Sequence, residues 1–470
     1  MTDNKKSTDM EELSKTLLQA PEYPSDKDSA VLEEAIAFCE GYKAFLNAGK
    51  TEREAAQTSE KMLLEAGYRA FDPDAHYQAG DKIYFINRQK CVVAATVGTQ
   101  PLEKGFHLNI AHIDCPRLDL KPTPLYEKDH FSLLKTHYYG GVRKYQWPTI
   151  PLAIHGVFCK ANGETVKVCI GEDAGDPVFC ITDLLPHLGK EQNDRKLSEG
   201  IKAEELNVLI GSHAVADEAV KERIKLNTMI LLHDKYGITE RDFARAEIEI
   251  VPAFGARDVG FDRSMIGAYG QDDRVDAYPA LMAEISVKSP AFTSVCVLTD
   301  KEETGSEGVT GMQSLYTFHF LEQLCRCQNA DYLRALKASK CLSADVTAAY
   351  DPTWDSAFEK MNGTYAGRGI AIFKYTGAGG KSGTSDANAE LVSYVADLCD
   401  ENHVAWQIGE MGRVDLGGGG TIAKFVARQD IDTLDIGVPV LSMHSPFEVT
   451  HKVDVLMAYR AFAAFLNSNK

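Results

Sequence analysis

Short apolar runs alternate with segments of helical periodicity along most of this chain, and a β-rich block interrupts the alternation once. Residues 105–111 and 294–299 are apolar enough to form buried strands, whereas residues 29–48 and 275–285 place their apolar side chains at helical spacing. Strands that alternate with helices favour a mixed or parallel sheet covered by helices. The sequence therefore predicts an α/β fold.

The interrupting block covers residues 118–251 and is dominated by short β-like runs. We interpret it as a β-rich domain inserted into a first domain that consists of residues 28–117 and 252–470. Residues 1–27 are polar and are expected to be frayed. At ~100–200 residues per domain, a chain of 470 residues leaves room for this arrangement. The β-like runs of the block are residues 150–157, 165–170, 206–210 and 246–251.

The net charge and the cysteine pattern exclude some classes of function and indicate a cellular compartment. The formal net charge of −18 argues against a nucleic-acid binder and against attraction to an anionic membrane surface. The N-terminal segment lacks the apolar core of a signal peptide, and we find no run of ~18 apolar residues that could span a membrane. The eleven cysteines are scattered without a CxxC pair, which is typical of reduced thiols in a cytoplasmic protein.

Two adjacent glutamates, Glu302 and Glu303, follow the apolar run 294–299 and precede Gly305. In open α/β sheets, ligands bind where the strands end. Because successive residues of an extended chain point to opposite sides, one carboxylate could hold a metal while the other handles a proton. An isolated pair of glutamates is more often a solvated acidic turn, so this interpretation depends on the rest of the chain.

Five strand-end or loop positions offer the carboxylates and imidazoles that zinc takes as ligands. Two metals held about 3.5–4 Å apart need a bridging carboxylate, together with a histidine and a carboxylate for each ion. Five ligands with one shared aspartate satisfy that count. The candidate ligands are His112, Asp272, Glu303, Asp345 and His444.

Two further acidic residues fit the same pattern. Asp114 lies two residues after His112 and could orient that imidazole by accepting its other N–H group. Glu302 is then left as a general base for a metal-bound water.

Each of these motifs is weak by itself. His112 could be a hydrogen-bonded buried histidine, Asp272 could complement the dipole at a helix N-terminus, and Asp345 could be a simple helix cap. The glycine run at 417–420 could be a flexible loop. Only the order of the motifs and their sequence context favour a common site.

Five short motifs carry a resemblance to a known family. In their order along the chain they resemble the aspartyl aminopeptidase family of co-catalytic dinuclear zinc metallopeptidases, and the similarity spans from about residue 30 to the C-terminus. The resemblance implies a three-layer α/β/α zinc-peptidase domain, an inserted β-rich dimerisation domain, and assembly into a dimer-based dodecamer. The motifs are His112-Ile113-Asp114-Cys115-Pro116, Gly270-Gln271-Asp272-Asp273-Arg274, Asp300-Lys301-Glu302-Glu303-Thr304-Gly305-Ser306, Ser343-Ala344-Asp345 and Met443-His444-Ser445.

The resemblance also implies two zinc ions per subunit, with Co²⁺ or Mn²⁺ as alternative metals. One ion would be held by His112, Asp345 and a bridging Asp272. The other would be held by Glu303, His444 and the same Asp272.

Roles for further residues follow from the same resemblance. Glu302 would be the general base, Asp114 would orient a metal-binding histidine, and His155 of the inserted domain would reach into the neighbouring subunit's site to contact the substrate. A strand histidine at a domain surface is an equally good interpretation of His155. A glycine loop would line the substrate cleft, where the backbone can approach the peptide closely. Its residues are Gly419, Gly420 and Thr421.

Two positions depart from the family pattern. Ala348 and Asp351 stand where the family often has histidines. A carboxylate near the pocket for the first residue would disfavour an acidic side chain by like-charge repulsion, which leaves open whether N-terminal Asp or Glu is preferred. Lys374 and Lys381 could supply a compensating positive charge.

The sequence thus predicts a metal-dependent aminopeptidase that removes N-terminal residues from peptides with a free N-terminus. The free α-amine would be held by acidic residues or by a metal. Two alternatives stay open at this point. One is another dinuclear zinc hydrolase, such as a deacylase or a carboxypeptidase, and the other is a non-catalytic self-assembling scaffold.

Overall fold

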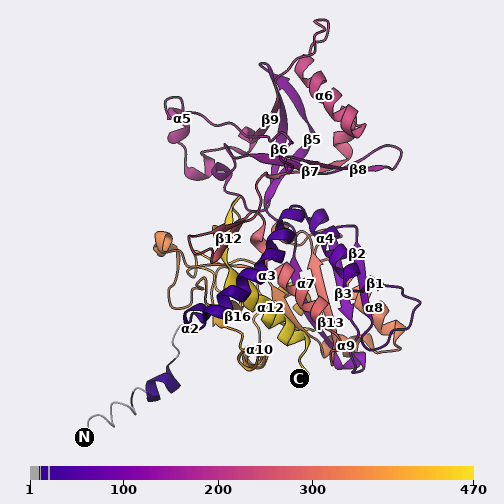
Figure 1. Cartoon of the computed structure of the whole chain (residues 1–470), viewed down its shortest axis with the longest axis vertical. Coiled ribbons are helices and arrows are strands. Elements are labelled where there is room, and N and C mark those ends of the chain that lie inside the picture. The colour runs from indigo at the N-terminus through magenta and orange to yellow at the C-terminus, as the bar shows by residue number, and fades with distance from the viewer. Residues whose placement is uncertain (1–9, 11, 19–21) are drawn as a thin grey trace.

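The computed structural model describes residues 10, 12–18 and 22–470, so part of the segment predicted to be frayed lies outside the described residues. Within that segment, helix α2 spans Pro24–Lys27. Figure 1 shows the chain in two parts, with the interrupting block at the top and the part that contains the C-terminus below it. No helix in the described ranges is both long enough and apolar enough to cross a membrane.

A nine-stranded mixed sheet runs through the larger part. Its four central strands, β13, β4, β14 and β18, are parallel to one another, so their C-terminal ends lie along one edge of the sheet. The strand order is β1 (Arg69–Ala70), β2 (Lys82–Asn87), β3 (Cys91–Thr96), β13 (Thr293–Thr299), β4 (Phe106–His112), β14 (Lys340–Ala344), β18 (Asp432–Gly437), β16 (Ile370–Phe373) and β17 (Trp406–Ile408).

Helices cover both faces of this sheet, and strand β3 shows why. Val92 and Ala94 belong to one hydrophobic core, whereas Cys91 and Val93 belong to another, because alternate residues of a strand point to opposite faces. The first core takes side chains from α3 (Ser29–Ala48), α4 (Glu52–Glu65), α7 (Gln271–Ser286), α10 (Ala389–Glu401) and α12 (Lys452–Leu466). The second takes them from α8 (Tyr316–Cys327), α9 (Tyr332–Lys337) and α11 (Ala423–Ala427). The predicted α/β fold class is confirmed, as a three-layer α/β/α arrangement.

The interrupting block forms an antiparallel sheet with a core of its own, in which Trp147 and Phe158 are buried. The sheet has the strand order β8 (Thr165–Ile170), β7 (Leu152–Cys159), β10 (Ala246–Pro252), β5 (Arg117–Lys128), β6 (Phe131–Tyr139) and β9 (Asn207–Gly211), and the block adds helices α5 (Lys190–Asn193) and α6 (Arg223–Tyr236). This part is the inserted β-rich domain. Its residue boundaries at 118 and 251 stay a prediction.

A small third sheet lies beside the edge where the central strands end. Its strands, in order, are β11 (Arg257–Val259), β12 (Met265–Ala268), β20 (Glu448–His451), β19 (Pro439–Leu441) and β15 (Thr347–Ala348). Short 3₁₀ helices complete the fold: η1 (Leu102–Lys104), η2 (Lys144–Gln146), η3 (Leu197–Glu199), η4 (Ala203–Glu205), η5 (Glu240–Arg245), η6 (Glu302–Thr304) and η7 (Pro352–Ala357).

Most predicted strands and helices lie within a few residues of the observed ones. Helix α4 begins at Glu52, because Thr51 is its N-cap: the Thr51 hydroxyl accepts from the Glu54 N–H at 3.3 Å, and the Glu54 carboxylate accepts from the Thr51 N–H at 3.2 Å. Strand β18 belongs to the main sheet and was not predicted, whereas the short strand β19 that follows it belongs to the small sheet.

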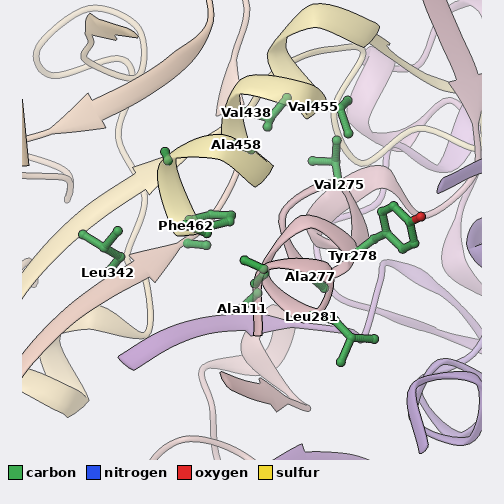
Figure 2. Packing of buried hydrophobic residues seen from close by; sticks show 14 of the residues in the cluster. Ala111, Val275, Ala277, Tyr278, Leu281, Leu342, Val438, Val455, Ala458 and Phe462 are labelled. Atoms are coloured by element: carbon green, nitrogen blue, oxygen red, sulfur yellow. The ribbon is translucent and has the colours of Figure 1, made fainter. Parts of the chain in front are cut away.

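Phe462 of α12 offers a test of the sheet-to-helix packing. Its ring is fully buried in the first core, near α7 and the strands (Figure 2). We expect Phe462→Ala to lower the free energy of unfolding by about 3–5 kcal/mol, because it removes a large side chain and leaves a cavity. The measurement is urea unfolding followed by fluorescence. Phe261→Ala, at a position that is fully exposed, should change the free energy by less than about 0.5 kcal/mol. Equal stability of the two variants would contradict the described packing.

Candidate metal centre

Three predicted site residues meet because three parallel strands end at the same edge. Strand β4 ends at His112, and its parallel neighbour β13 places Thr299 opposite His112, three residues before Glu302. On the other side of β4, strand β14 ends at Ala344, directly before Asp345. The polar side chains that follow these apolar strands are therefore brought together at the C-terminal edge.

Two further predicted residues lie in segments that adjoin strands of the small sheet. Asp272 lies at the N-terminal end of α7, after β12, and His444 lies in the turn between β19 and β20. The buried carboxylate of Glu448 joins these segments: one oxygen accepts from the N–H groups of Gln271 and Asp272 at 2.6 and 3.1 Å, and the other accepts from the His444 N–H at 2.7 Å. Glu448 was not predicted as a site residue.

The five candidate ligands form two half-sites that share Asp272. Nε2 of His112 lies 3.2 Å from Oδ1 of Asp272 and 3.9 Å from Oδ1 of Asp345. Nε2 of His444 lies 3.0 Å from Oδ2 of Asp272 and 3.5 Å from Oε1 of Glu303. Each histidine thus faces a different oxygen of one carboxylate, which is the arrangement that a bridging ligand requires.

The polar atoms of this cluster fit cations. Nε2 of His112, Oδ1 of Asp272 and Oε1 of Glu303 are buried and make no hydrogen bond to another described residue. Buried polar atoms are normally hydrogen-bonded, so several unsatisfied atoms that converge on one place need another partner. Imidazole and carboxylate donors suit zinc.

Both histidines are oriented through their second ring nitrogen. Nδ1 of His112 lies 3.0 Å from the carbonyl oxygen of Asp114 and 3.3 Å from its Oδ1 atom. Nδ1 of His444 donates to the carbonyl oxygen of Gly141 at 2.9 Å. These contacts leave Nε2 of each ring for a metal, as is usual for metal-binding histidines.

Glu302 lies beside the half-site of His112. Single side-chain atoms of His112, Glu302 and Asp345 lie within 4.8 Å of one another. The N–H group of Glu302 donates to Oδ1 of Asp114 at 3.1 Å, which fixes its backbone. Burial raises the pKa of the Glu302 carboxyl to about 7, a range that suits a group that accepts and returns a proton near neutral pH.

The predicted glycine loop lies next to Asp345. Thr421 and Asp345 line the same small cavity of about 20 Å³. The Thr421 hydroxyl donates to Oδ1 of Asp435 at 2.6 Å, and the carbonyl oxygen of Gly419 accepts from the Gly377 N–H at 2.6 Å. Asp435 is a buried aspartate of the unpredicted strand β18 and was not among the predicted site residues.

A larger cavity, of about 730 Å³, lies next to Glu303. It is lined by Glu303 and Thr304 from the main part and by residues of β5, β6 and Gly140 from the inserted domain. The candidate metal centre therefore lies where the two parts of the chain meet.

The remaining predicted residues lie elsewhere. His155, in β7, is buried, with Nδ1 2.8 Å from Oε1 of Glu54 and Nε2 3.0 Å from Oε1 of Glu172, and a single chain does not bring it to the cluster. Asp351 caps η7 by accepting from the Thr353 N–H at 2.8 Å.

The two lysines considered for the first-residue pocket lie on an exposed stretch of chain. The ammonium group of Lys381 lies 3.0 Å from Oδ2 of Asp386, and the side chain of Lys374 is exposed. Neither lysine lines the small cavity beside Asp345.

Comparison with known proteins agrees with this architecture. A profile of the family described as "Aminopeptidase I zinc metalloprotease (M18)" matches residues 45–466. The chain is 45% identical over 449 residues to the "Probable M18 family aminopeptidase 1" of Clostridium acetobutylicum, which covers 94% of this chain and 97% of the relative.

Solved structures give the same result. The crystal structure of aminopeptidase I from Clostridium acetobutylicum is similar, with a TM-score of 0.90 at 42% identity, covering 96% of this chain and all of the other. An M18 family aminopeptidase from Thermotoga maritima has a TM-score of 0.88 at 43% identity, covering 93% of this chain and 97% of the other. The motifs, the fold and these similarities lead to one conclusion: the chain belongs to the M18 family of zinc aminopeptidases.

Proposed function

We propose that the chain removes N-terminal residues from peptides with two zinc ions per subunit. His112, Asp345 and Asp272 would hold one ion, and Glu303, His444 and the same Asp272 would hold the other. The observation that carries this proposal is the position of Asp272, whose two carboxylate oxygens each lie close to a different histidine. Co²⁺ or Mn²⁺ would fit the same donors, because imidazole and carboxylate do not select zinc alone.

When bound, the zinc ions would polarise the first peptide carbonyl and lower the pKa of the attacking water. Glu302 would accept the proton from that water and pass it to the nitrogen of the leaving peptide. Asp114 would hold both the imidazole of His112 and the backbone of Glu302 in place, since it contacts both.

The substrate would enter beside the glycine loop. Gly419, Gly420 and Thr421 would line its path, and the hydrogen bond between Thr421 and Asp435 would hold the loop against the sheet. The acidic side chains around the cluster would favour a cationic α-amine, in keeping with a peptide that has a free N-terminus. A preference for an acidic first residue is not part of the proposal, because Asp351 serves as a cap and neither lysine lines the small cavity.

A role for His155 in trans requires a second copy of the chain. We propose a homo-oligomer built from dimers, in which the inserted domain makes the dimer contact and His155 contacts the partner's substrate. Two observations support this proposal: His155 does not reach the cluster of its own chain, and the S. cerevisiae mApe1 dodecamer shares the fold with a TM-score of 0.74 at 20% identity. His155 would have to exchange its present contacts with Glu54 and Glu172.

A cytoplasmic location is also part of the proposal. The eleven cysteines all lie within the described residues and none of them is in a disulfide. Free thiols are typical of a reducing compartment.

An assay of amino-acid release tests the proposed function. We expect free amino acids to be released from short peptides with a free N-terminus and not from N-acetylated copies. A chelator should abolish release, and zinc, cobalt or manganese should restore it. Equal cleavage of the N-acetylated peptides would indicate a deacylase or a carboxypeptidase. Absence of both bound zinc and hydrolysis would favour a scaffold.

A further inference from the structure

One short segment of the inserted domain contacts the candidate metal centre of its own chain. This segment, the 139–141 segment, consists of Tyr139, Gly140 and Gly141, which end strand β6 and begin the following loop. Each of its three residues contacts a different residue of the metal cluster or of its support. The sequence motifs do not include any of them.

Tyr139 contacts Asp114, which is the common support of the site. The Tyr139 hydroxyl donates to Oδ2 of Asp114 at 2.7 Å. Besides its contacts with His112, the same carboxylate accepts from the N–H groups of Glu302 and Glu303 at 3.1 and 3.3 Å. The phenol of the inserted domain therefore fixes the carboxylate that positions one proposed ligand, the proposed base and the backbone of a second ligand.

The two glycines contact the other half-site. The carbonyl oxygen of Gly141 accepts from Nδ1 of His444 at 2.9 Å. Gly140 packs against Glu303, since a Cβ atom at Gly140 would lie 2.9 Å from Oε2 of that glutamate. One segment thus contacts both proposed ligands that belong only to the second ion.

Buried charges hold the 139–141 segment on the larger part. The guanidinium of Arg117 lies 3.9 Å from the centre of the Tyr139 ring and 3.1 Å from the Glu249 carboxylate of the inserted domain. It also lies 3.5 Å from the carboxylate of Glu52 in α4, which pairs with Lys90 at 3.0 Å. Breaking a buried ion pair costs free energy, because one charge is left buried without its partner. These ion pairs therefore keep the 139–141 segment in a fixed position.

We propose that the 139–141 segment is a positioning element of the metal centre, so that zinc affinity depends on the seating of the inserted domain on the same chain. This inference rests on the proposed ligand set and goes beyond it, because it gives the inserted domain a role within one subunit. Hydrogen bonds to the side chains that bind a metal fix the orientation of the imidazole rings and the basicity of the ligands. The loss of such a hydrogen bond typically lowers metal affinity or activity by about 10–100-fold.

Tyr139→Phe is the first test. It removes the hydroxyl and keeps the ring that packs on Arg117, so we expect the fold to survive. Zinc affinity, measured by competition with a chromophoric chelator, should fall by about 10–100-fold. In the zinc-saturated enzyme kcat should fall while KM changes little, because the segment holds the catalytic groups and not the peptide. The control is Tyr126→Phe in β5 of the same sheet, where no hydrogen bond to the hydroxyl is found among the described residues, and zinc affinity should stay within twofold.

Gly141→Ala is the second test. A Cβ atom there would lie 3.0 Å from Nδ1 of His444 and would displace that imidazole. We expect the variant to lose the ion held by His444 first. At a chelator concentration that leaves two ions on the wild-type chain, the variant should keep about one ion per chain. The control is Gly175→Ala, also in the inserted domain, where a Cβ atom would meet nothing within 4 Å.

The outcomes separate this inference from the proposed function. If Tyr139→Phe and Gly141→Ala both keep wild-type zinc affinity and kcat, the 139–141 segment is not a positioning element, whatever the ligands are. If His112→Ala leaves zinc binding unchanged in an otherwise intact protein, the proposed ligand set itself is wrong. A thermal melt of each variant without zinc shows whether it is folded, so a loss of affinity in a folded variant supports the inference.

Discussion

Replacing Glu302 by glutamine should lower kcat by about 10²–10⁴-fold and leave zinc content unchanged. Glutamine has almost the same shape as glutamate but cannot take a proton from water. The N–H contact from residue 302 to Asp114 involves the backbone and persists in the variant. Because Glu302 is not one of the five proposed ligands, both ions should stay bound. The measurements are the steady-state rate on an aminoacyl substrate and the zinc content by atomic absorption.

The matched control for this experiment is Glu307→Gln. Glu307 is exposed on the same loop, and among the described residues its carboxylate accepts only from the Gln313 side chain, at 3.0 Å. The rate of the Glu307→Gln variant should therefore stay within about twofold of wild type. Two results would contradict the assignment. Turnover that survives Glu302→Gln would place the base elsewhere, and loss of zinc from Glu302→Gln would mean that Glu302 is a ligand, as its closeness to His112 and Asp345 would allow.

The assignment of the two adjacent glutamates shows where the sequence stops being informative. A Glu-Glu pair at a strand end predicts two carboxylates with different tasks, but alternation alone does not say which carboxylate has which task. The fold separates them: Glu303 lies 3.5 Å from Nε2 of His444, whereas Glu302 lies with His112 and Asp345. Their different neighbours come from the turn at η6, in which Lys301 and Gly305 both have positive φ.

The sequence was sufficient to predict where residues at the end of a buried strand lie in the fold. His112 and Asp345 come at the ends of apolar runs, and parallel pairing brings those ends together. Strand β18 could not be predicted, because it contains two aspartates and ends in glycine, residues that are depleted in strands. It forms because β14 and β16 pair with it on both sides, and Gly437 is required because a Cβ atom there would lie 1.7 Å from the carbonyl oxygen of Asp345.

Two residues that support the candidate ligands, Glu448 and Tyr139, could not be identified from the sequence. Glu448 bonds to the backbone of Asp272 across 176 positions, and Tyr139 reaches Asp114 from a different domain. No local pattern marks either residue, since a glutamate and a tyrosine in strands are ordinary. Their role exists only after separate sheets have packed together. The candidate ligands and Asp114 could thus be named from motifs, whereas Glu448 and Tyr139 required the fold.

The proposed bridging role of Asp272 leads to the second large effect. Asp272→Ala should remove both zinc ions, whereas His444→Ala should remove one. Asp272 offers Oδ1 to the half-site of His112 and Oδ2 to that of His444, so its loss takes a ligand from each ion and leaves the remaining acidic groups close together without compensation. Losing a residue that only hydrogen-bonds to a metal ligand typically lowers activity by about 10–100-fold. The Asp272→Ala variant should lose more activity than that.

Zinc per chain, measured after gel filtration at equal protein concentration, distinguishes the two ligand arrangements. A shared carboxylate predicts about two ions for wild type, one for His444→Ala and none for Asp272→Ala. Asp262→Asn serves as the control, because the Asp262 side chain lies in an exposed turn and accepts from Ser264 alone within the described part of the chain. This variant should keep two ions. One ion retained by Asp272→Ala would show that the half-sites are independent and that Asp272 does not bridge them. The two-ion proposal would then lose its central ligand.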